Sequence, residues 1–165
     1  MTQRLSKPEN VNVLITDASW AWPQAVSEIF QPRGINALLA NNGSEIVRLV
    51  SNNKIHLAIL DSVIKDLTGM QALKVVRQHD PLVPCILLAQ QPEKRFLAEA
   101  LALNAFSVLA KPVDLSLLAE QIDRLFIKCY ASDMFSGPAS SRSLKISIKT
   151  VTNQSRTNSQ NGKEQ

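Results

Sequence analysis

The chain has 165 residues, of which 45% are hydrophobic and 5% aromatic. This length suits one domain with a substantial core and excludes two domains of ordinary size. The formal net charge is +4, but residues 1–133 carry 13 basic and 13 acidic side chains, so the excess positive charge lies in residues 134–165. We therefore expect no basic stripe that follows a phosphate backbone, and no direct nucleic-acid binding by the domain.

No segment of the sequence has the pattern of a signal peptide or a membrane span. Residues 1–10 lack an apolar region, and no run approaches the ~18 apolar residues that a spanning helix needs. Cys85 and Cys129 lie in apolar runs without a CxxC pair, so we expect buried free thiols in a reducing compartment. His56 and His79 are isolated in the sequence and are interpreted as structural. These features predict a cytoplasmic protein without membrane contact.

Five short apolar runs in the first 110 residues are of strand length. Their apolar residues are nearly continuous rather than alternating, which is typical of strands that are covered on both faces. The predicted strands are residues 11–16, 35–40, 55–60, 84–89 and 106–110.

The segments between these strands have helical spacing of apolar residues. Strands that alternate with helices of this length predict a parallel sheet with right-handed crossovers. The predicted helix boundaries are Pro23 and residues 32–34 for the first helix, Ser44 as N-cap of the second, Gly69 and residues 80–81 for the third, Pro92 for the fourth, and Asp114 as cap of the fifth.

The composition changes near residue 133, which gives three predicted parts. Residues 1–10 form an N-terminal extension, residues 11–133 form the domain, and residues 134–165 form a disordered, basic and polar tail. The tail is rich in Ser, Thr, Asn and Gln and cannot bury enough apolar surface to offset its ordering entropy. Residues 144–149 alternate apolar and polar side chains, so this piece either has no structural meaning or pairs with a sheet edge on a partner.

The predicted strands end in polar groups. In an open parallel sheet, functional groups collect beyond the carboxyl ends of the strands. Asp17 follows the first strand, Asp61 the third and Lys111 the fifth, so two carboxylates and an ammonium group are expected at one edge. In a purely structural interpretation, the two aspartates cap helices or loops and Lys111 neutralises them.

The motifs "LITDAS", "ILDSVIKDLTG" and "LAKP" resemble those of the receiver domain of two-component response regulators, over residues 11 to about 130. The resemblance implies an α/β, flavodoxin-like (βα)5 fold with a doubly wound, five-stranded parallel sheet in the order 2-1-3-4-5. It also implies that Asp61 is the phospho-acceptor, that Lys111 contacts the phosphoryl group, and that Asp17 and Asp61 hold Mg²⁺.

The chemistry of these residue types agrees with the resemblance. A carboxylate can act as a nucleophile toward phosphorus, and a divalent cation between the anionic groups reduces their repulsion. We hypothesise a stand-alone response regulator, not an enzyme, that accepts a phosphoryl group on Asp61 in a phosphorelay. Its partners would be a sensor histidine kinase or phosphotransfer protein and an unknown downstream protein, reached through protein-protein contacts.

Several positions depart from the pattern of the family. Thr16 replaces one of two usual acids, which weakens Mg²⁺ binding by removing a charge near the metal. Ala89 replaces a hydroxyl residue and Val108 an aromatic residue, so the coupling between a phosphoryl group and the surface should be impaired. Lys65 stands where proline is common, either as a partner of Asp61 or as a solvated charge.

Two other functions compete with the leading hypothesis. The departures favour a degenerate receiver, a protein-interaction module that works without phosphorylation. A flavodoxin-like enzyme that binds a nucleotide or flavin would need a Gly-rich or Ser/Thr-rich loop after the first strand, and "DASWAWPQ" offers none. Trp20 and Trp22 in this segment either line the edge of the site or a partner surface, or pack against neighbouring elements.

Overall fold

The computed structural model of the chain describes residues 10–16 and 20–130. Its contacts define one unit over Glu9–Leu125 and a second that comprises Met1–Pro8 and Phe126–Gln165. The first unit carries the sheet. Asp17, nine of the ten residues of the predicted extension, the predicted tail and the domain boundary at residue 133 lie outside the described residues.

The described part of the chain contains one sheet of five strands in the order β2-β1-β3-β4-β5. All four strand pairings are parallel. This confirms the predicted fold class and strand order. The strands are β1 Val11–Thr16, β2 Ile35–Ala40, β3 Leu57–Asp61, β4 Cys85–Ala89 and β5 Ser107–Ala110.

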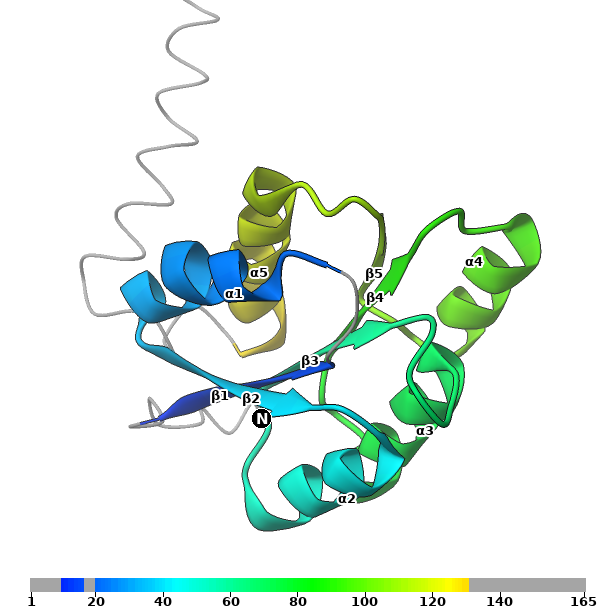
Figure 1. The fold of residues 1–165 in the computed structure, drawn as a ribbon, viewed down its shortest axis with the longest axis horizontal. Helices are drawn as coiled ribbons and strands as arrows, with labels where there is room; N and C mark the ends of the chain where they lie inside the picture. Colours follow the sequence, from blue (N-terminus) through cyan, green and yellow to red (C-terminus); the bar gives the residue numbers. More distant parts are fainter. Residues whose placement is uncertain (1–9, 17–19, 131–165) are drawn as a thin grey trace, which may run out of the picture. The chain divides into compact units, whose positions relative to one another are not determined.

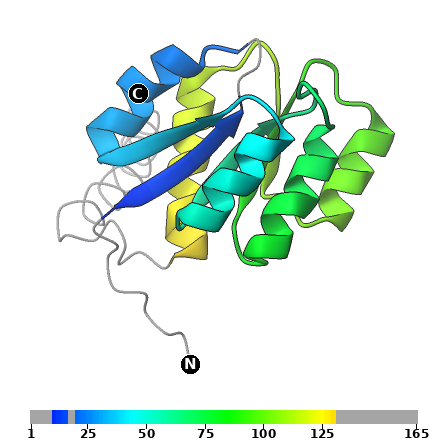
Figure 2. The same ribbon diagram turned by 60° about the horizontal axis from the view of Figure 1, so that its bottom comes forward.

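Helices cover both faces of the sheet. Within the first unit, α1 and α5 lie on one face and α2, α3 and α4 on the other (Figure 1), and the turned view shows the last three side by side (Figure 2). Burial on both faces explains why the strands are apolar throughout. The helices are α1 Trp22–Ala25, α2 Gly43–Asn52, α3 Gly69–His79, α4 Lys94–Ala102 and α5 Leu115–Cys129.

The first crossover is less regular than the sequence predicts. Pro23 lies in the first turn of α1, as expected, but the helix continues as a π-helical turn at Val26–Phe30 and a 3-10 turn at Gln31–Arg33. Gly34 ends it with a φ of 67°, a left-handed conformation that glycine adopts without steric cost. The predicted stop at residues 32–34 is thus confirmed, whereas a single regular α-helix is not.

The predicted N-cap of the second helix is wrong. Asn42, not Ser44, caps α2, because its side chain accepts a hydrogen bond from the Glu45 amide at 2.9 Å. The Glu45 carboxylate accepts from the Asn41 amide at 2.6 Å, so the two side chains bracket the helix start and Ser44 falls inside the first turn. Asp114 caps α5 as predicted, accepting from the amides of Ser116 and Leu117.

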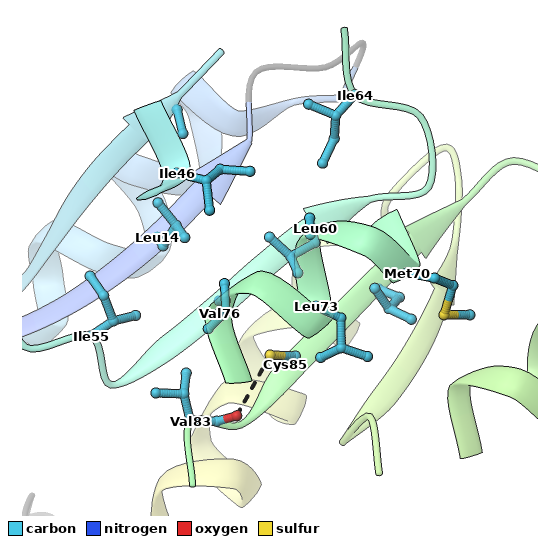
Figure 3. Packing of buried hydrophobic residues seen from close by; sticks show 14 of the residues in the cluster. Leu14, Ile46, Ile55, Leu60, Ile64, Met70, Leu73, Val76, Val83 and Cys85 are labelled. Atoms are coloured by element: carbon cyan, nitrogen blue, oxygen red, sulfur yellow. Dashed lines mark hydrogen bonds between the residues drawn. The ribbon is translucent and has the colours of Figure 1, made fainter. Parts of the chain in front are cut away.

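The core between β3 and the helices α2 and α3 is apolar (Figure 3). All five residues of β3 are buried. Cys85 belongs to this core, and its burial raises the pKa of the thiol to about 12, so the thiolate is scarce at neutral pH. Cys129 is exposed, so the expectation of a buried thiol is wrong there. No helix in residues 10–16 and 20–130 is long and apolar enough to cross a membrane.

His56 has a structural place just before β3. It is buried, its Nδ1 accepts a hydrogen bond from the Asn12 amide at 3.0 Å, and its own amide donates to the Asn12 carbonyl at 2.8 Å. Burial lowers the pKa of His56 below its usual value, and the nearby charge of Lys54 lowers it further. The neutral imidazole therefore helps to join β1 to β3.

Protonation of His56 should destabilise the fold. Because the pKa of His56 is lower in the folded than in the unfolded chain, its contribution is fully present above about pH 6.5 and is lost as the pH falls through the folded value. His56→Asn keeps an acceptor near the Asn12 amide without titrating. Urea unfolding of this variant should show a weaker loss of stability between about pH 6.5 and about pH 5 than the unmodified protein. His79→Asn, at an exposed position, is the control, and an equally steep loss in His56→Asn would contradict the assignment.

Candidate functional site

The site forms where β3 reaches the carboxyl edge of the sheet. Asp61 ends this strand, and its side chain is 1% exposed. Its Oδ2 lies 2.5 Å from the Nζ of Lys111, and its Oδ1 accepts a hydrogen bond from the Val63 amide at 2.9 Å. A buried carboxylate is costly without such partners. The structure therefore supplies a cation and a backbone donor to the one charge at the end of this apolar strand.

The sheet order explains how Lys111 reaches Asp61. Strand β4 lies between β3 and β5, and the Lys111 amide donates to the Ala89 carbonyl at 2.9 Å, just beyond the ladder that pairs Ala89 with Ala110. The Lys111 side chain is 13% exposed, so its charge lies largely out of solvent. The structure thus brings together two of the three predicted site residues, which are 50 positions apart in the sequence.

Thr16 has a structural role that the sequence did not indicate. Its Oγ1 accepts a hydrogen bond from the Asp61 amide at 2.9 Å, and its carbonyl accepts one from the Trp20 indole at 3.1 Å. Trp20 is 8% exposed and is thus packed, whereas Trp22 is half-buried. Thr16, which lies where an acid is expected from the resemblance, therefore holds the end of β3 against β1. Nothing in the spacing of Thr16 and Asp61 signals this bond.

A tight hairpin follows Asp61, and we call residues 62–69 the β3–α3 hairpin. Val63 forms an antiparallel bridge with Thr68, the Ile64 amide donates to the Leu67 carbonyl, and the Gly69 amide donates to the Ser62 carbonyl. The hairpin thus returns the chain to the end of β3 before α3 begins.

Gly69 is required where the hairpin closes. A Cβ at this position would lie 2.6 Å from the Asp61 carbonyl oxygen and 2.9 Å from the Ser62 Cα. Both are backbone atoms, which cannot rotate away. The spacing of eight residues between Asp61 and Gly69 therefore reflects a close approach of two backbone segments.

The other predicted positions have clear places. Lys65 is exposed at the hairpin, and the cation on Asp61 is Lys111. Ala89 is buried, Gln90 is exposed, and Val108 is half-buried against the core. Neither Ala89 nor Val108 carries a polar or aromatic group that could follow a change at Asp61.

Asp61 also has the chemistry of a magnesium ligand, since Mg²⁺ prefers carboxylate oxygens. Within the described residues, no group of three His, Cys, Asp or Glu side chains could hold a metal ion. Asp17, the other predicted ligand, lies outside them. Asp61 is thus the one predicted ligand in the described part of the site, and Mg²⁺ binding stays a prediction.

Replacing Gly69 by alanine should damage the site and the fold together. The added methyl must displace backbone at Asp61 or Ser62, and we expect a loss of about 2 kcal/mol in the free energy of unfolding. Urea unfolding measures this loss. Ala at Gln71, an exposed position in the first turn of the same helix, should cost less, because it removes only a capping contact. An equal or smaller loss for Gly69→Ala would contradict the close approach.

The chain is similar in sequence to several known regulatory proteins. The chain is 22% identical over 125 residues to the transcriptional regulatory protein ZraR of Escherichia coli (strain K12), covering 76% of this chain and 28% of that protein. It is 24% identical over 115 residues to the sporulation initiation phosphotransferase F of Bacillus subtilis (strain 168), covering 70% of this chain and 93% of that one. The chain thus spans less than a third of ZraR but most of the phosphotransferase.

A solved structure and a family model complete the comparison. The crystal structure of a two-component response regulator from Clostridium difficile matches with a TM-score of 0.65 at 23% identity, covering 72% of this chain and 98% of that one, and so has the same fold. Residues 13–123 match the model of the response regulator receiver domain. This match covers β1 from Val13 onward, the other four strands and more than half of the sequence. The chain belongs to the response regulator receiver domain family.

Proposed function

We propose that Asp61 accepts a phosphoryl group from a sensor histidine kinase or a phosphotransfer protein in a two-component phosphorelay. Receiver domains are signalling modules rather than typical enzymes. In this chain, Asp61 would be the residue that receives the phosphoryl group. The observation that carries it is the buried Asp61 carboxylate at the end of β3, with Lys111 on one oxygen and the Val63 amide on the other. The stand-alone role and the downstream partner stay predictions.

In the proposed transfer, the protein supplies one nucleophile for the covalent step, and its other groups position the reactants and offset charge. An Asp61 oxygen attacks phosphorus, a new O–P bond forms, and the bond to the donor nitrogen or oxygen breaks. The leaving group keeps the electron pair and takes a proton from solvent. Lys111 is positioned to offer its charge to a phosphoryl oxygen, while the Val63 amide remains a donor beside the acceptor.

Magnesium would complete the charge balance. Asp61 and Asp17 would hold the ion, which, when bound, reduces the repulsion between the carboxylate and the incoming phosphoryl oxygens. Thr16 supports the expectation of weaker Mg²⁺ binding. Its hydroxyl carries no charge and already accepts a hydrogen bond from the Asp61 amide.

The proposal predicts a single modified residue. Incubation with acetyl phosphate and Mg²⁺ should add the mass of one phosphoryl group to the intact protein, and Asp61→Asn should abolish this addition. Asp80→Asn, at the opposite edge of the sheet, is a control that should leave it unchanged. Failure of the unmodified protein to react, under conditions in which an established receiver reacts, would refute the proposal.

A second candidate function is a degenerate receiver that binds a partner without phosphorylation. Ala89 and Val108 favour it, because a conformational switch needs a group with different contacts in its two states. Ala89 offers no hydroxyl to a phosphoryl oxygen, and Val108 is already packed against the core. If Asp61 is modified, we therefore propose that the surface changes little.

The two candidates differ in an NMR experiment with beryllofluoride, a phosphoryl mimic. We expect large amide shifts to be confined to the β3–α3 hairpin and the residues around Lys111. Partner affinity should change by less than about tenfold, or about 1.4 kcal/mol. Equally large shifts along α4, β5 and α5 would contradict this expectation and show that another residue transmits the signal.

A further inference from the structure

The tip of the β3–α3 hairpin contacts the start of α2. The Gly43 amide, the first of this helix, donates a hydrogen bond to the Asp66 Oδ1 at 2.8 Å. A carboxylate at a helix N-terminus interacts favourably with the helix dipole, and a charged acceptor strengthens the bond. Asn42 already accepts from the Glu45 amide. Asp66 therefore satisfies a separate donor, from a segment 23 positions away.

The packing at this contact is tight. A Cβ added at Gly43 would lie 2.9 Å from the Leu67 Cδ2 and 3.3 Å from the Asp66 Oδ2. The Leu67 Cδ2 is the end of a flexible side chain, so a methyl group at position 43 would displace that side chain rather than the backbone of the hairpin. Two consecutive hairpin residues, one polar and one apolar, touch the same helical residue.

A second anchor holds the same hairpin from the core side. Ile64 is 5% exposed and belongs to the apolar cluster that contains Ile46 of α2. Figure 3 shows it extending from the hairpin beyond β3 toward that cluster. Val63, by contrast, is 75% exposed, so the outer side of the hairpin faces solvent. The position of the hairpin therefore depends on Ile64 and Asp66.

The base of the hairpin contacts the proposed phospho-acceptor. The Val63 amide donates to the Asp61 Oδ1, and the Val63–Thr68 bridge and the Ile64–Leu67 hydrogen bond join this base to the tip. We propose that Asp66 is a positioning residue: by docking the hairpin on the start of α2, it holds the Val63 amide against the Asp61 carboxylate. Its consequence for phosphoryl transfer rests on the proposed function.

Asp66→Ala removes the acceptor of the Gly43 amide, whereas Asp66→Asn keeps an acceptor oxygen without the charge. Hydrogen exchange of the Val63 amide, followed by NMR without any phosphodonor, should become about fivefold faster in Asp66→Ala and should change less in Asp66→Asn. The rate of modification by acetyl phosphate with Mg²⁺ should fall by about the same factor.

Two controls separate positioning from stability. Lys65→Ala changes the neighbouring exposed residue of the same turn and should leave both measurements unchanged. Asn42→Ala removes a cap from the same helix end and should lower the melting temperature while the Val63 amide stays protected. The expected pattern is thus an effect of Asp66→Ala on Val63 exchange beyond its loss of stability.

Unchanged Val63 exchange in Asp66→Ala would overturn the inference. So would an effect of Asn42→Ala of the same size at equal loss of stability, because the role of Asp66 would then be structural only. If the unmodified protein accepts no phosphoryl group, the proposed function fails separately. Val63 exchange still decides whether Asp66 positions the hairpin.

Discussion

The pairing of Asp61 with Lys111 is the interaction on which the site depends. A carboxylate that is 1% exposed at the end of an apolar strand needs a cation within contact distance. The chain supplies Lys111, which directly follows β5 and reaches Asp61 across β4. The sheet order makes this possible, because β3 and β5 flank the same neighbour and end at the same edge. The ion pair thus follows from the topology of the sheet.

The surrounding contacts fix the position of Asp61 from three sides. The Thr16 Oγ1, at the end of β1, accepts a hydrogen bond from the Asp61 amide. The Val63 amide, in the hairpin, donates a hydrogen bond to the Asp61 Oδ1. Gly69 lets the hairpin close directly on the Asp61 carbonyl. These contacts come from neighbouring strands and from the chain that follows Asp61, so the geometry of the carboxylate is held by backbone as well as by side chains. The carboxylate therefore has little conformational freedom left.

The sequence predicted those features that repeat along the chain or follow from strand ends. Continuous apolar runs indicated strands covered on both faces, and the positions of Asp61 and Lys111 after two such runs predicted their meeting. The sequence did not reveal the bonds of Thr16 to the Asp61 amide or of Asp66 to the Gly43 amide. In both, the donor is a backbone amide of a distant segment, and such a donor leaves no trace in residue types. The N-cap of α2 was misplaced by two residues for a related reason, since both Asn42 and Ser44 are suitable caps and the choice depends on Glu45.

A double-mutant cycle on Asp61 and Lys111 measures how strongly the two side chains stabilise each other. The free energy of unfolding in urea would be measured for the unmodified protein, for Asp61→Asn, for Lys111→Met and for the double variant. If Lys111 compensates the buried carboxylate, Lys111→Met alone should be strongly destabilising, and the double variant should recover much of that loss. We expect a coupling free energy of about 2 kcal/mol. Additive effects, within about 0.5 kcal/mol, would show that Asp61 is buried without help from Lys111 and would contradict the account.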